Sequence, residues 1–141
     1  MSGTARFSGL CHCINTRRAA NAITEFYDRL LKPCGLSVSQ FSLLLNLERL
    51  GEANASRLAR YVGLERSTIV RNIKQLARNN LVEDAPGSTS RNHLTRVTDT
   101  GKAAVQCGLP LWEQAQQEID ARVGSERLEV FQDILKRLQQ L

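Results

Sequence analysis

The sequence has little of what would place it outside the ordinary globular proteins. Its 141 residues include three prolines, four cysteines and no apolar run near the ~18 residues of a membrane-spanning helix. With three prolines and nine glycines, collagen-like and low-complexity character are excluded. Four cysteines are too few for a disulfide scaffold, so we expect reduced thiols. The opening residues MSGTARFSGL contain no apolar signal-peptide core, and we therefore expect a cytoplasmic protein.

Motifs of the common enzyme classes are also missing. The sequence has no Gly-rich phosphate loop and no paired-carboxylate motif, and His12 and His93 are its only histidines. Cys11, His12 and Cys13 are metal-ligating residue types, but on one helix their side chains point about 100° apart and cannot converge on one ion. We therefore expect a protein that is not an enzyme and that holds no metal or cofactor.

The charge distribution is uneven. The formal net charge is +5, and residues 54–96 contain eight basic residues against three acidic ones, so this segment carries the whole excess. The basic residues are Arg57, Arg60, Arg66, Arg71, Lys74, Arg78, Arg91 and Arg96. Chance could produce such a cluster, but a positive segment is also what a polyanion-binding surface requires.

Helical periodicity covers most of the chain. Two helices are expected in the first third of the chain, one that ends before Pro33 and one that starts after Ser37 or Ser39. Further helices are expected to begin at Asn54, to cover 66–79, to begin at Thr98 and to begin after Ser125. Residues 81–84 and 94–97 read as short strands around a polar turn. The predicted fold is therefore mainly α with a small β-hairpin wing: a winged helix-turn-helix with N- and C-terminal dimerisation helices.

The helix predicted over 66–79 has two different faces. If Ile69, Ile73 and Leu76 point inward, helical geometry places a set of polar and basic side chains outward. This set comprises Ser67, Thr68, Arg71, Lys74, Gln75 and Arg78. An exposed helix face normally mixes acids and bases, whereas this one has no acid. The face suits the major groove of DNA, and Arg91 and Asn92 on the wing would reach phosphates or an adjacent minor groove.

The chain resembles the MarR family of bacterial transcriptional regulators from about Leu10 to Leu141. The resemblance is carried by residues 35–45, 58–64, 67–71 and 80–82, and by Val97-Thr98-Asp99-Thr100-Gly101. It implies a dimer that binds pseudo-palindromic double-stranded DNA, usually as a repressor released by a small phenolic or anionic ligand or by oxidation. Thr89 stands where the family wing commonly has an aspartate that would orient Arg91, so we expect the wing to be looser or to grip DNA differently.

The resemblance implies a division of the chain. Residues 1–34 and 98–141 would form a helical dimerisation region, and 35–97 the DNA-binding region of one intertwined domain. A seam of apolar side chains in the last helix could pair with a second copy. These side chains are Leu128, Phe131, Leu135, Leu138 and Leu141.

Several modes of control and one other function stay open. The hydroperoxide-sensing branch of the family has a reactive cysteine that aligns with Cys13 and a tyrosine that aligns with Tyr27. Arg17 and Arg18 could lower the pKa of that thiol, or bind an anionic effector, and Cys107 could resolve the oxidised cysteine. The rival function is a winged-helix module for protein contact, which would not need an acid-free face.

Overall fold

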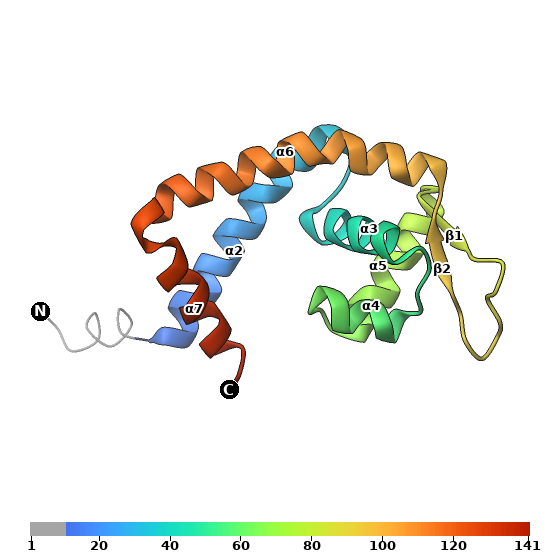
Figure 1. Ribbon diagram of the computed structural model, residues 1–141, viewed down its shortest axis with the longest axis horizontal. Helices are drawn as coiled ribbons and strands as arrows, with labels where there is room; N and C mark the ends of the chain where they lie inside the picture. The colour runs from blue at the N-terminus through green and yellow to red at the C-terminus, as the bar shows by residue number, and fades with distance from the viewer. Residues whose placement is uncertain (1–10) are drawn as a thin grey trace, which may run out of the picture.

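The computed structural model describes residues 11–141, so Leu10 and the first ten residues of the predicted 1–34 region lie outside the described residues. The elements in order are α2 (His12–Leu31), η1 (Lys32–Cys34), α3 (Val38–Leu50), α4 (Ala55–Val62), α5 (Arg66–Arg78), β1 (Val82–Asp84), β2 (Thr95–Val97), α6 (Asp99–Val123), η2 (Ser125–Arg127) and α7 (Leu128–Leu138). The long helix α6 spans the molecule. One of its ends adjoins the lobe of α3, α4, α5 and the hairpin, and the other adjoins α2 and α7 (Figure 1). The predicted mainly α winged helix-turn-helix is confirmed.

Local capping explains where the helices start. Ser37 and Gln40 form a capping box at α3, in which each side chain bonds to the backbone N–H of the other residue. Asn54 caps α4, as predicted, and the Thr98 hydroxyl accepts the Gly101 N–H at 3.0 Å to cap α6. The last helix starts later than predicted, because the 3-10 turn η2 occupies Ser125–Arg127 before α7 begins.

The core lies between α3 and the elements around it. Phe41, Leu43, Leu44 and Leu47 of α3 are fully buried, which agrees with a helix that is apolar on nearly all sides. They pack in one cluster with residues of α2, α4, α5, the hairpin and α6. The helices that carry the exposed polar face are therefore fixed to a rigid centre.

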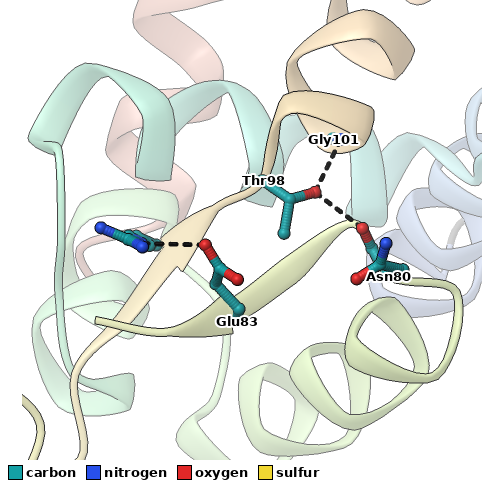
Figure 2. A network of polar contacts seen from close by, with 5 residues as sticks. Asn80, Glu83, Thr98 and Gly101 are labelled. Atoms are coloured by element: carbon teal, nitrogen blue, oxygen red, sulfur yellow. Dashed lines mark hydrogen bonds and ion pairs between the residues drawn. The ribbon is translucent and has the colours of Figure 1, made fainter. Parts of the chain in front are cut away.

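A polar network fastens the hairpin to the helices on each side of it. The strands pair antiparallel, with Val82 opposite Val97. The Thr98 hydroxyl donates to the Asn80 carbonyl at 2.6 Å, which connects the end of α5 to the start of α6 (Figure 2). Ala53 adds a short bridge to Thr95, so the chain segment before α4 also pairs with the hairpin.

The middle of α6 lies close against the start of α3. A Cβ atom on Gly108 would come within 2.7 Å of the Phe41 ring, so glycine permits this contact. The helix continues through Pro110, although proline removes one backbone donor. Cys107 forms a disulfide with Cys34 of η1, with 5.9 Å between the Cα atoms. The expectation that all thiols are reduced is wrong, because the fold brings together two cysteines 73 residues apart.

The C-terminal helix α7 has few partners among residues 11–141. It contains no buried residue, and Val130, Ile134, Leu135 and Leu138 expose between 38% and 59% of their surface. Leu128 and Phe131, which the sequence placed in the same apolar seam, are half-buried. No helix within 11–141 has the length and apolarity needed to cross a membrane.

Candidate nucleic-acid interface

Two helices joined by a tight turn place the polar face. Gly63 joins α4 to α5 with φ of 76°, a left-handed conformation that glycine adopts without strain. Leu58 of α4 and Ile69 and Leu76 of α5 are fully buried, while Ile73 is half-buried. These contacts fix the rotation of α5 about its axis, and so determine which of its side chains face outward.

The outward face of α5 has the composition that the sequence predicts. Exposed residues on it are Ser67, Arg71, Lys74, Gln75 and Arg78, whereas Thr68 is half-buried. The Gln75 side-chain oxygen accepts a hydrogen bond from Gln40 Nε2 at 3.1 Å. Gln75 is therefore bonded to α3 at the edge of the face, and the other exposed side chains of the face form no side-chain hydrogen bond or ion pair within 11–141.

The cations of this face are not neutralised within the described chain. Glu83 pairs with Arg96 at 3.0 Å and Asp84 with His93 at 3.0 Å, whereas the basic residues of α5 form no ion pair within 11–141. The hairpin thus holds its acids against its own basic groups. The positive charge of α5 stays available to an external anion.

Hydroxyl groups bond to the backbone of the wing, which lacks the aspartate that the resemblance led us to look for. The Thr89 hydroxyl accepts the Asn92 N–H at 3.0 Å, and the Thr89 N–H donates to the Asn92 carbonyl at 3.0 Å. The Ser88 hydroxyl accepts the Leu94 N–H at 3.0 Å. A hydroxyl therefore does here what a carboxylate commonly does at such a turn. Arg91 lies between these bonded residues, and its side chain is exposed.

A cleft separates the wing from α5. Its volume is about 390 Å³, and Arg66 and Lys74 of α5 line it together with Arg91 and His93 of the wing. Arg66 is held in place, because its Nε donates to the Ser56 hydroxyl of α4 at 3.3 Å. Several cationic groups therefore converge on one cavity, which suits a phosphate group.

Of the residues predicted for redox or effector control, Tyr27 lies far from Cys13 within one chain. Cys13, Arg17 and Arg18 are exposed on the first part of α2, and Tyr27 lies fourteen residues beyond Cys13. That separation is about 21 Å along a helix. The Tyr27 hydroxyl instead donates to Gln116 of α6. Burial raises the pKa of Tyr27, and the nearby Asp120 carboxylate raises it further.

The cysteines are also arranged differently from the sequence expectation. Cys107 cannot resolve an oxidised Cys13 in this structure, because it is already bonded to Cys34. Cys11 and Cys13 are the free cysteines. Within residues 11–141 no three His, Cys, Asp or Glu side chains are grouped so that they could hold a metal ion. A sensing role for Cys13 stays a prediction.

Sequence reasoning missed three contributors to this interface. Arg66 was counted only as part of the charge, although it lines the cleft. Asn54 was identified as a helix cap, but its amide also donates to Asn92 Oδ1 at 3.0 Å. The pairing of His93 with Asp84 had no local signal. Nothing in the sequence alone connects Asn54 before α4 with Asn92 in the wing, because their contact depends on how the chain folds.

The fold and the exposed basic helix define a winged helix-turn-helix protein. The sequence pattern of the MarR family matches residues 36–91. This chain is similar to the M. tuberculosis transcriptional regulator MosR, whose crystal structure in complex with DNA is known, with 38% sequence identity. The match covers 92% of this chain and 95% of the MosR chain, and the two structures superpose with a TM-score of 0.80. The chain belongs to the MarR family.

Two curated relatives from Bacillus subtilis (strain 168) are uncharacterized HTH-type transcriptional regulators. The HTH-type transcriptional regulator YwoH is 33% identical over 89 residues, which is 63% of this chain. The HTH-type transcriptional regulator YdgJ is 27% identical over 106 residues, which is 74% of this chain. The matched segments span 64% and 65% of the lengths of these two relatives.

Proposed function

We propose that the protein is a sequence-specific double-stranded DNA-binding transcriptional regulator, and that residues 35–97 form its DNA-binding region. The observation that carries the proposal is the exposed face of α5, whose cations have no acidic partner within 11–141. Ser67, Thr68, Arg71, Lys74 and Arg78 contact DNA from α5, with Gln75 at the edge of the contact. Arg91 adds a phosphate or minor-groove contact from the wing.

The active form is a homodimer on a pseudo-palindromic operator. The helix α7 exposes Val130, Ile134 and Leu138 and buries none of its residues against the rest of 11–141. A second copy covers such an apolar face, with residues 11–34 and 98–141 forming the interface. The two copies of α5 then enter successive major grooves about 34 Å apart.

Control by a small molecule is part of the same proposal, with repression released when the effector binds. A cleft of about 430 Å³ lies between α2 and α6. Its apolar lining includes Ala22, Ile23, Phe26 and Ile119, and its charged lining residues are Arg29, Arg122 and Glu118. An apolar wall with arginines suits a small phenolic or anionic compound. Arg17 and Arg18 do not line this cleft, so Arg29 and Arg122 are further candidate effector contacts, and effector binding by Arg17 and Arg18 stays a prediction.

The proposal is tested by selecting binding sites from a random duplex pool and measuring affinity against salt. We expect half-sites one helical turn apart and an affinity that falls steeply with salt. Arg71→Ala should relax base preference and cost about 1–3 kcal/mol if the arginine bridges a guanine, whereas Lys74→Ala should weaken all duplexes about equally. Lys136→Ala on α7 is the charge-matched control, used once sedimentation velocity has shown that this variant is still a dimer. If the wild-type protein does not bind duplex DNA at low salt, the result favours a winged-helix module for protein contact over a DNA-binding regulator.

A further inference from the structure

Asn54 joins two parts of the DNA-binding region with one side chain. Its Oδ1 accepts the Arg57 N–H at 2.8 Å and so caps α4. Its Nδ2 donates to Asn92 Oδ1 at 3.0 Å and so reaches the tip of the wing. Because each atom has its own partner, the cap and the wing contact can be separated by substitution. We call the Asn54–Asn92 contact the clasp.

The clasp acts on the part of the wing that is otherwise farthest from support. The base of the hairpin is held by strand pairing and by the bridge between Ala53 and Thr95. At the tip, the hydrogen bonds of Thr89 and Ser88 lie within the wing itself. Within residues 11–141, the clasp is the side-chain hydrogen bond that connects this tip to the helix-turn-helix.

The clasp bears on DNA binding because Asn92 is next to Arg91 in the wing. Arg91 precedes Asn92 directly, and both residues line the basic cleft together with Asn54, Arg66 and Lys74. A wing tip that is free to move would spread the Arg91 guanidinium over a wide volume. A clasped tip keeps that guanidinium on the same cleft as the cations of α5, where one DNA phosphate can meet both elements.

We propose that Asn54 and Asn92 are positioning residues that hold Arg91 for contact with the DNA backbone, an inference that rests on the proposed function. The side chain of Asn92 then serves the wing and not the DNA directly. This replaces the direct DNA contact that the sequence suggested for Asn92. It also gives Asn54 a role beyond capping.

The substitutions follow from the two bonds of Asn54. Asn54→Ser keeps a good capping oxygen but is too short to reach the wing, and Asn92→Ala removes the same contact from the other side. Each should weaken operator binding by about 2- to 10-fold, the range that one net hydrogen bond supplies. The double variant should bind no worse than either single variant.

The test combines equilibrium titration of a fluorescent operator with hydrogen exchange of the free protein. Both single variants should speed exchange of the Asn92 and Leu94 amides while the thermal midpoint of unfolding stays unchanged. In an Arg91→Ala background, adding Asn92→Ala should have no further effect on affinity. The salt dependence of binding should fall equally for Asn92→Ala and Arg91→Ala, by about one phosphate contact.

Other results would overturn the inference. If Asn54→Ser leaves affinity unchanged while Asn92→Ala lowers it, Asn92 contacts DNA itself. Additive losses for Asn92→Ala and Arg91→Ala show that the clasp does not act through Arg91, and unaltered wing exchange shows that there is no clasp. A wild-type protein that binds no duplex refutes the proposed function instead, and in that case the exchange data still decide whether the wing is clasped.

Discussion

The disulfide between Cys34 and Cys107 makes a quantitative prediction about stability. It closes a loop across a sequence separation of 73 residues. In the chain-entropy treatment, a crosslink over such a loop destabilises the unfolded chain by about 4 kcal/mol. The contacts around it survive without it, because Leu31, Phe41 and Gly108 pack tightly at the same place. Removing the bond should therefore lower the free energy of unfolding by about 4 kcal/mol without changing the fold.

The assay is urea unfolding of the oxidised protein, the reduced protein and a Cys34→Ala/Cys107→Ala variant at one protein concentration. For a chain of 141 residues, a loss of that size lowers the thermal midpoint by about 10–15 °C. Reductant should produce nearly the same shift as the double substitution. Cys107 is exposed and Cys34 half-buried, so reductant has access to the bond without prior unfolding.

Matched variants show whether the reasoning holds. A Cys11→Ser/Cys13→Ser variant retains the disulfide and should respond to reductant like the wild type, whereas Cys34→Ala/Cys107→Ala should not respond. Equal stability of the oxidised and reduced proteins would refute the entropic argument. If the Cys11→Ser/Cys13→Ser variant no longer responds to reductant, the reductant acts on Cys11 or Cys13 and not on the bond between Cys34 and Cys107.

Three further changes test packing, ionisation and assembly. Gly101→Ala places a Cβ atom 2.1 Å from the Leu81 carbonyl oxygen, so it should lower the free energy of unfolding, measured in urea, by at least about 1–3 kcal/mol. Gly87→Ala is the control and should leave this free energy unchanged, because its Cβ atom meets its nearest neighbour at 3.6 Å. Because the pKa of Tyr27 is raised on folding, the folded chain holds its proton longer, so stability falls as pH rises above about 10. Tyr27→Phe should remove that part of the alkaline loss in denaturation curves compared at about pH 9 and pH 11, and an identical loss in both proteins would contradict this. Ile134→Glu should turn the dimer into monomers in sedimentation velocity, and an intact dimer would place the interface away from α7.

Local signals in the sequence predicted most of the helix boundaries. Asn54 and Thr98 were recognised as caps because their side chains bond to backbone only three residues away. The inward set on α5 followed from spacing alone, since Ile69 and Leu76 lie on one face of any regular helix. Such features need no knowledge of the rest of the fold, and the structure agrees with them.

Contacts between distant residues could not be predicted in the same way. Cys34 and Cys107 meet only because η1 lies against the middle of α6. The clasp between Asn54 and Asn92 likewise depends on how the hairpin folds back toward α4. The spacing of residues along a single sequence does not reveal either of these distances in space. The expectation of free thiols failed for this reason, and composition alone could not have corrected it.

Because α6 is one continuous helix, a tilt at one of its ends moves the other end. Its 25 residues extend for about 37 Å, with the Thr98 cap and the wing at one end and α7 at the other. A tilt of about 5° at the α7 end displaces the wing end by about 3 Å, which is half the width of the DNA minor groove. In the proposed dimer, a small rearrangement where the two copies meet would therefore displace the wing enough to weaken its contact with DNA, without any change in the residues that face the nucleotides.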